Sequence, residues 1–148
     1  MNIAIANDHV AVELKKILAE HLMSKGHSVT DCGTNSGDRV DYPIYAKLVA
    51  DEIKNGSCER GILICGSGVG MCIAANKFAG IRAVVCSEPY SAKLSREHNF
   101  TNILCMGARV IGIETAKMIA DIWIEAEFEG GRHAERLDMI KNFENRDV

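Results

Sequence analysis

Residues 61–72 read GILICGSGVGMC, and this stretch decides the fold. Its first half is a continuous apolar run that ends at Cys65, without the polar alternation of a half-exposed strand. Such a run is typical of a parallel strand that helices cover on both faces. Three glycines follow in the pattern Gly-Ser-Gly-Val-Gly, and apolar residues resume after them. We therefore interpret the stretch as a buried strand, a glycine loop and the start of a helix.

The same alternation of strand and helix extends in both directions from this stretch. The expected strands cover residues 2–6, 27–32, 60–65, 81–86 and 101–107. The expected helices cover residues 11–26, 42–56, 69–80, 89–99, 111–130 and 132–148. In the first helix, apolar residues recur at helical spacing at Leu14, Ile17, Leu18, Leu22 and Met23. Strands that alternate with helices predict a parallel sheet with right-handed crossovers.

The fold class that follows is α/β, a three-layer, Rossmann-like αβα sandwich with about five parallel strands. No linker or low-complexity tract divides the 148 residues, so we expect a single domain over residues 1–148. The extra C-terminal helix, expected after Gly131, has no strand to serve. It could pack on a partner subunit or on its own domain, and the sequence leaves both open.

Composition and charge exclude several classes of function. The net charge of −3 gives no global basic field, so we expect no nucleic-acid partner. No apolar stretch approaches the roughly 20 residues that span a bilayer, and the first residues lack the features of a signal peptide, so we expect a cytoplasmic protein with no membrane partner. The six cysteines include no CxxC pair, which disfavours a zinc knuckle. Most of them are expected to be reduced structural thiols.

Residues with reactive or polar side chains follow the expected strands at their carboxyl ends. In parallel sheets of this class, ligands bind beyond that edge. Asp8 and His9 follow the first strand, the glycine loop follows the third and Arg109 follows the fifth. Tyr42 comes a little after the second strand. The sequence therefore predicts a site at this edge of the sheet.

The glycine loop after Cys65 is the strongest of these signals. Gly66, Gly68 and Gly70 allow positive φ, and their amides can form a nest for negative charge. The spacing is neither that of a phosphate-binding P-loop nor a strict GxGxxG, so a simple tight turn is an open alternative. Amides near Cys65 would favour a thiolate, which can act as a general base or a nucleophile. The alternative is a buried cysteine at the end of a strand.

Other candidates each have a structural alternative. Asp8 or Asn7 could cap a helix, with His9 incidental. His98, near the end of an expected helix, is either an acid/base group or a residue favoured there by the helix dipole. Arg132 and Arg136 lie one helical turn apart, an arrangement that suits a phosphate or simply forms a solvated basic patch.

Taken together, the motifs resemble one enzyme family. The chain is similar to the ribose-5-phosphate isomerase B family, which belongs to a broader group with allose-6-phosphate and galactose-6-phosphate isomerases. The resemblance is carried by DH at 8–9, DYP at 41–43, ILICGSGVG at 62–70, the block at 73–99 and GGRHAER at 130–136. It implies the interconversion of D-ribose 5-phosphate and D-ribulose 5-phosphate through an enediolate, a step of the pentose phosphate pathway. It implies no metal and no other cofactor.

The resemblance also implies roles for the matching residues. Cys65 is similar to the family's base, which moves a proton between C2 and C1, and Ser67 to a hydroxyl residue that assists it. His98 matches the residue that opens the sugar ring. The residues implied to bind substrate are Asp8, His9, Tyr42, Gly66, Gly68, Val69, Gly70, Asn99, Arg109, Arg132 and Arg136. Among them, the loop amides would hold the enediolate, and the arginines with His9 would hold the phosphate.

In the family, two subunits share each active site, so the resemblance implies a homodimer or a dimer of dimers. Two other functions remain open. A dinucleotide-binding domain would use the glycine loop with Glu88 about 20 residues further on, although the glycine spacing differs and no substrate domain is expected. A sugar-phosphate sensor on the same fold would bind the ligand without needing Cys65 as a base.

Overall fold

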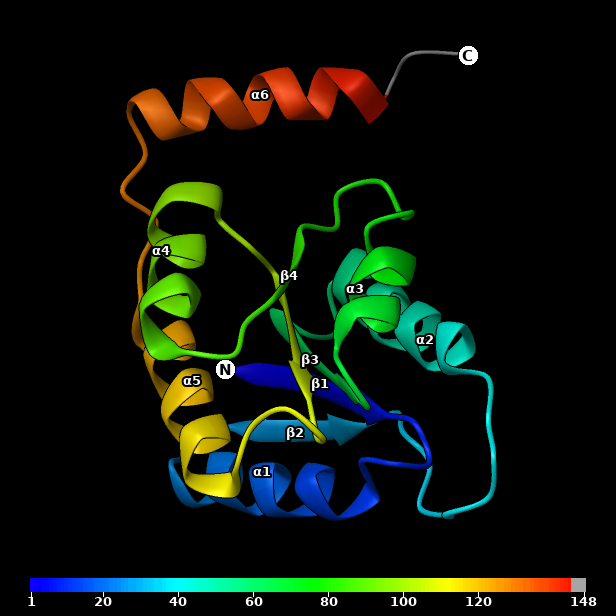
Figure 1. Ribbon diagram of the computed structural model, residues 1–148. Helices are drawn as coiled ribbons and strands as arrows, with labels where there is room; N and C mark the ends of the chain where they lie inside the picture. Colours follow the sequence, from blue (N-terminus) through cyan, green and yellow to red (C-terminus); the bar gives the residue numbers. More distant parts are fainter. Residues whose placement is uncertain (145–148) are drawn as a thin grey trace.

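The computed structural model describes residues 1–144 and has a five-stranded, wholly parallel sheet at its centre (Figure 1). The strands are β1 (Asn2–Asn7), β2 (Ser28–Asp31), β3 (Arg60–Cys65), β4 (Ala83–Val85) and β5 (Ile103–Gly107), in the order β2-β1-β3-β5-β4. The expected α/β sandwich is confirmed. The order reverses between β1 and β3, so the end of β3 lies at the point where this class of sheet binds ligands.

Helices cover both faces of the sheet. They are α1 (Val12–Ser24), α2 (Tyr42–Lys54), α3 (Val69–Ala75), α4 (Pro89–Asn99), α5 (Ile113–Glu125) and α6 (Arg132–Glu144). The first, fourth and fifth helices pack on one face, and α2 and α3 on the other (Figure 1). Helix α6 follows α5 without an intervening strand and lies against α4, outside the two helical layers.

Successive side chains of the central strands enter two separate cores. In β3, Ile62 and Ile64 pack toward α1 and α5, whereas Leu63 and Cys65 pack toward α2 and α3. This alternation follows from the two-residue period of a strand, and the strand can be apolar throughout because both faces are covered. Cys65 therefore lies on the α2–α3 side of the sheet, where α3 begins directly beyond it.

The covered-strand interpretation holds for the central strands but is wrong for the edge strands. Residues of β2 and β4 are largely exposed or half-buried, because each edge strand has one neighbour and an incomplete helical cover. Both are also shorter than expected.

On α1, Met23 is exposed, whereas Lys15 takes a buried position between Leu14 and Leu18.

Two expected helices end five residues earlier than the sequence pattern indicated. Helix α3 ends at Ala75 rather than at residue 80, because the Asn76 side chain turns away to bond the backbone of Ala83 with both its amide nitrogen and its oxygen. Helix α5 ends at Glu125 rather than at residue 130, since Ala126 is already extended. The last four residues expected in α6 lie outside the described part of the chain. Within residues 1–144, no helix combines the length and apolar character needed to cross a membrane.

Candidate active site

A cavity of about 570 Å³ opens at the carboxyl edge of the sheet. It lies at the end of β3, where the strand order reverses. Its lining residues are Asp8, Tyr42, Cys65, Gly66, Ser67, Val69, Gly70, Arg109 and Val110. All but Val110 are candidates from the sequence, so the expected edge is confirmed as a place where these residues meet.

The sulfur of Cys65 is held by the loop that follows it. Cys65 is only 5% exposed and packs with the α2–α3 core, yet it also lines the cavity. The backbone amide of Gly68 donates a hydrogen bond to Sγ at 3.1 Å. A thiolate gains more from such a donor than a thiol does, since charge-assisted hydrogen bonds are the stronger ones. The residue is therefore both a buried cysteine at the end of a strand and a group aimed at open space.

The glycine loop uses its glycines in two different ways. Of its three, only Gly68 adopts the positive φ that glycine allows, at 80°. Gly70 is needed for space instead. A Cβ there would stand 2.7 Å from Cζ of Tyr42, well inside contact distance. The missing side chain thus lets the Tyr42 ring lie directly on the loop.

Asp8 shapes the turn between β1 and α1. It is 7% exposed, and its Oδ1 accepts a hydrogen bond from the amide of Val10 at 2.9 Å. Helix α1 has its N-cap at Ala11, so the alternative in which Asp8 or Asn7 caps this helix is wrong. The Asp8 amide donates to the carbonyl of Ile64, which ties the carboxylate to the strand that carries Cys65.

Ser67, Arg109 and His9 complete this side of the site. Ser67 is exposed, and its Oγ accepts a hydrogen bond from the amide of Val69 at 3.3 Å. The amide of Arg109 donates to the carbonyl of Gly66, which places its guanidinium beside the loop. Nδ1 of His9 accepts from the amide of Val40 at 3.4 Å. In the neutral ring the proton therefore lies on Nε2, where it can be donated to a ligand.

Four further candidates lie elsewhere in the same chain. Helix α4 starts beyond the carboxyl end of β4 and runs back, so His98 and Asn99 lie at the amino ends of the strands. Arg132 and Arg136 are exposed on α6, which packs against α4. None of these four lines the cavity at Cys65. A single described chain therefore presents two clusters at opposite edges of its sheet.

The cluster at the α4–α6 junction has its own geometry. The rings of His98 and His133 stack with centroids 4.2 Å apart and planes 4° from parallel. Nε2 of each ring lies near Oε2 of Glu129, at 3.7 Å for His98 and 3.6 Å for His133. Burial, the charge of His98 and the charge of Arg132 lower the pKa of His133. Its ring is therefore held more neutral than a free imidazole.

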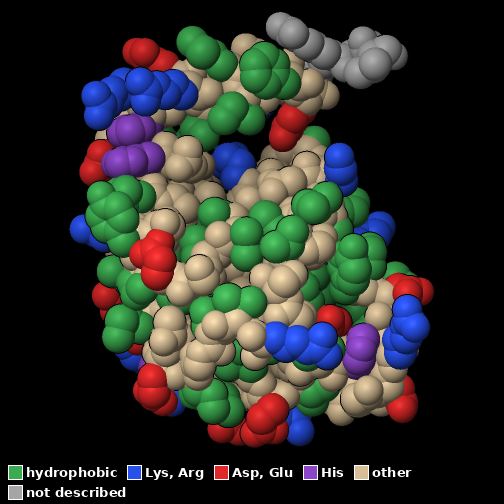
Figure 2. All heavy atoms as spheres, viewed as in Figure 1, with side chains coloured by type: hydrophobic (Ala, Val, Ile, Leu, Met, Phe, Trp, Pro, Cys, Tyr) green, Lys and Arg blue, Asp and Glu red, His purple; other side chains and the backbone are tan. Residues whose placement is uncertain are grey.

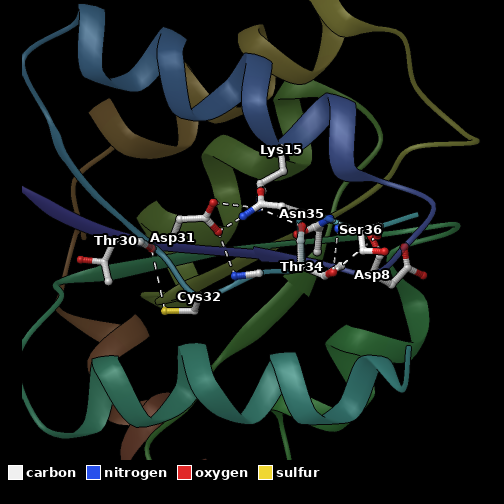
Figure 3. A network of polar contacts seen from close by, with 10 residues as sticks. Asp8, Lys15, Thr30, Asp31, Cys32, Thr34, Asn35 and Ser36 are labelled. Carbon is white, nitrogen blue, oxygen red and sulfur yellow. Dashed lines mark hydrogen bonds and ion pairs between the residues drawn. The ribbon is translucent and has the colours of Figure 1, made fainter. Parts of the chain in front are cut away.

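A buried lysine supports the site from beneath, and the sequence analysis missed it. Nζ of Lys15 donates to both carboxylate oxygens of Asp31, at 2.9 and 2.7 Å, and to Thr34 and Asn35 (Figure 3). The lysine is fully buried on the apolar face of α1. The available signal in the sequence was a lysine on the helix face that also carries Leu14 and Leu18, where a buried residue is expected. It fixes the loop after β2, which leads to Tyr42.

The structure also bears on the dinucleotide alternative. Glu88 would have to offer its carboxylate to a ribose, but both oxygens cap α4 instead. They accept hydrogen bonds from the amides of Tyr90 and Ser91 at 2.6 and 2.8 Å. A hydrogen bond from the Ser91 side chain, together with these two amide hydrogen bonds, lowers the pKa of Glu88. Its role is explained by the helix start, which removes the main support for a dinucleotide site.

Comparison with known proteins fixes the family. Residues 3–140 match the sequence model of the ribose/galactose isomerase family. The chain belongs to this family. Ribose-5-phosphate isomerase B of Escherichia coli, a relative, is 57% identical over 144 residues, which cover 97% of each chain. A D-erythrulose-4-phosphate isomerase of Pectobacterium atrosepticum is 44% identical over 148 residues, with 99% of this chain and 97% of the relative covered.

Solved structures of family members share the fold over almost the whole chain. Ribose-5-phosphate isomerase B of Clostridium thermocellum superimposes with a TM-score of 0.96 at 49% identity, covering 97% of both chains. The Mycoplasma genitalium enzyme with bound ribulose-5-phosphate superimposes with a TM-score of 0.94 at 44% identity, covering 99% of this chain and 97% of that one. Family membership and fold thus agree at every level of the comparison.

Proposed function

We propose that this protein is a ribose-5-phosphate isomerase that interconverts D-ribose 5-phosphate and D-ribulose 5-phosphate. Its family, and relatives that carry this activity in their names, support the proposal. The observation that carries it is local. The sulfur of Cys65 lies at the floor of a cavity, under a loop whose Gly68 amide already donates to it. This is the arrangement that proton transfer next to a carbonyl requires.

The chemistry follows from the weak acidity of the proton to be moved. A hydrogen beside a sugar carbonyl is removed only if a base is in contact and the charge on the neighbouring oxygen is stabilised. In the proposed mechanism the Cys65 thiolate takes the proton from C2, and the thiol returns it to C1. Amides of the 66–70 loop, with the Ser67 hydroxyl, face the enediolate oxygens. A preorganised donor at such an oxygen is worth about 3–4 kcal/mol of barrier.

Opening the sugar ring and holding the phosphate need further groups. We propose His98 as the acid/base group that opens the ring, because a histidine titrates near neutral pH. Asp8, Tyr42 and Asn99 would bind sugar hydroxyls. His9, Arg109, Arg132 and Arg136 would bind the phosphate, for which guanidinium groups offer paired hydrogen-bond donors.

We further propose that each complete site is built by two copies of the chain. Cys65 lies at one edge of the sheet and His98 at the other, so one chain cannot bring both to the same sugar. A second cavity, of about 490 Å³, lies between α6 and the β4–α4 region, and exposed Ile140 and Phe143 line it. Such an apolar cleft suits the body of a partner subunit. We infer a homodimer or a dimer of dimers with shared sites.

We propose that the reaction needs no cofactor and that the protein is located in the cytoplasm. All six cysteines are unpaired, which fits a reducing compartment. The preferred sugar is decided by assay. Turnover of ribose 5-phosphate, allose 6-phosphate and D-erythrulose 4-phosphate should be compared with and without EDTA. Activity that a chelator abolishes would contradict the metal-free mechanism.

The decisive variant is Cys65→Ala. It should abolish turnover of ribose 5-phosphate while the protein still binds this sugar phosphate, measured by calorimetry. Cys58→Ala is the matched control, because Cys58 is also buried on the α2–α3 side but lies before β3, away from the cavity. A Cys65→Ala protein that turns over normally would contradict the proposed base. If the unmodified protein shows no isomerase activity and Cys65→Ala still binds the sugar phosphate normally, the sensor function is favoured.

A further inference from the structure

The cluster at the α4–α6 junction brings three potential metal ligands together. His98 comes from the last turn of α4, Glu129 from the segment after α5, and His133 from the first turn of α6. One ligand atom from each lies within 4.8 Å of the others. Figure 2 shows histidine side chains at the molecular surface, next to basic side chains at the start of α6. Glu129 is exposed and His98 is half-buried, so an ion can reach the cluster from solution, although His133 itself is buried.

The distances between the ligand atoms of the cluster are close to the ligand-to-ligand distances in a tetrahedral metal site. Bonds of about 2.0–2.2 Å to nitrogen and oxygen put neighbouring ligands of tetrahedral zinc roughly 3.4 Å apart. The two contacts from Nε2 to Oε2 of Glu129 are 3.6 and 3.7 Å. Because the two imidazoles are stacked nearly parallel, their Nε2 atoms lie side by side. The lone pairs lie in two nearly parallel ring planes, so at least one ring must turn out of the stack for both nitrogens to bind one ion near the carboxylate.

We propose that His98, Glu129 and His133 bind a divalent transition-metal ion of the zinc class, and that the bound ion inhibits the isomerase. Two imidazoles and one carboxylate leave a tetrahedral ion an open position for water. The inhibition rests on the proposed function. A metal on Nε2 of His98 occupies the atom that ring opening needs, and Cys65 of the same chain lies at the other edge of the sheet, outside this cluster.

The charges around the cluster predict a moderate, reversible affinity. Glu129 supplies the negative charge. Arg132 and Arg136 act in the opposite direction, because their positive charges next to His133 repel a dication. The ion is thus expected to compete for the site rather than to be a permanent component of the fold.

Direct binding is tested first, with Co²⁺ as the spectroscopic probe on the full-length protein. The expected result is a visible d–d spectrum without a thiolate-to-metal charge-transfer band, because all three ligands are nitrogen or oxygen. Glu129→Gln keeps the size of the side chain, and it should weaken binding by at least about tenfold, as changes around metal sites commonly do. A thiolate band, or equal binding by Glu129→Gln, would overturn the site.

Inhibition is tested second, by adding zinc chloride to the ribose 5-phosphate assay. Glu129→Gln should keep the basal rate and lose at least about nine-tenths of its sensitivity to zinc. His133→Asn provides a second variant with the same expected loss of sensitivity, so the test does not depend on one substitution. Zinc inhibition that persists in both variants would place the ion elsewhere, Cys65 included, and would overturn the proposal.

The two measurements separate the possible failures. Without cobalt binding, the metal site is wrong whatever the enzyme does. If cobalt binds as expected but the metal-free protein turns over no sugar phosphate, the site stands and the proposed function fails. If cobalt binds and zinc leaves an active enzyme uninhibited, the inhibitory role is wrong.

Discussion

The amide of Gly68 donates to the sulfur of Cys65 across 3.1 Å, so the loop after β3 folds back onto the residue that ends the strand. A positive φ of 80° at Gly68 makes this turn possible. A side chain there would also meet the backbone of Met106 at 2.9 Å. The sulfur, the loop and the neighbouring strand β5 therefore hold one another in place, and the chemistry assigned to Cys65 depends on that arrangement.

The contact between Gly70 and Tyr42 gives a first prediction. In Gly70→Ala, the new Cβ would lie 2.7–2.9 Å from the Tyr42 ring, so the ring or the loop must move. A displacement of this size at a reacting site can cost on the order of 100-fold in rate. We expect kcat/KM for ribose 5-phosphate to fall by at least about tenfold.

The control for this variant is Gly66→Ala. Its Cβ would meet only the Arg109 side chain, at 3.8 Å, an ordinary contact distance, and Gly66 has no positive φ. It should therefore affect kcat/KM much less than Gly70→Ala. Equal losses in the two variants would show that any side chain in the loop is harmful, and that the packing of Tyr42 is not the cause.

The separation of Cys65 and His98 gives a second prediction. Cys65→Ala and His98→Asn should each be inactive alone, because each spoils both sites of a symmetric dimer. A mixed dimer would hold one site with both defects and one intact site. Co-expression in equal amounts should thus restore about one quarter of the wild-type activity. Measurement of isomerase activity in the purified mixture checks this, and no recovery in a verified mixed dimer would contradict shared sites.

The buried Lys15 gives a third prediction, about stability. Lys15→Met would leave the Thr34 carbonyl and part of Asp31 without their buried donor, while Asp31 keeps some contact with water. Loss of such a donor costs about 1–3 kcal/mol of unfolding free energy. Urea unfolding should show this loss, whereas Lys16→Met, on the exposed side of the same helix, should change little. Equal effects of the two substitutions would mean that the network does not stabilise the fold.

Cys72 gives a fourth prediction, about thiol reactivity. A hydrogen bond from Cys105, which outweighs the effect of burial, lowers the pKa of Cys72 to about 7, whereas burial raises that of Cys86 to about 12 and that of Cys32 to about 11. Because the thiolate is the reactive form, iodoacetamide at pH 7.5 should label Cys72 before these two. Its labelling rate should rise as pH increases through 7. Mass spectrometry of digested protein checks the order, and earlier labelling of Cys86 would contradict it.

The fold was predictable because its signals are local. The apolar runs at β1, β3 and β5 indicate central strands that helices cover on both faces. Gly26 and Pro89 mark the end of α1 and the start of α4, and each lies within two residues of the helix end in the structure. The shortening of α3 was not predictable in the same way. It depends on the Asn76 side chain reaching Ala83, a contact that appears only once β4 lies beside the helix.

The candidate site was predictable in membership but not in arrangement. The rule that ligands bind beyond the carboxyl ends of parallel strands identifies Asp8, Cys65 and Arg109 from the sequence alone. It gave no information on His98 or Arg132, which were singled out by their positions in expected helices and were given roles by the family resemblance. Lys15 was missed because a lysine in a helix is usually solvated, and its burial requires the partners that the loop after β2 supplies.

By itself, the sequence determined the order of strands and helices, the fold class and the residue types available for proton transfer, because hydrophobic periodicity and glycine spacing act over a few residues. Only the tertiary structure decided that Cys65 meets the Gly68 amide, that Gly70 exists to admit the Tyr42 ring, and that His98 lies at the opposite edge beside Glu129 and His133. These relationships join segments far apart in the chain, and they are set by how the helices pack on the sheet.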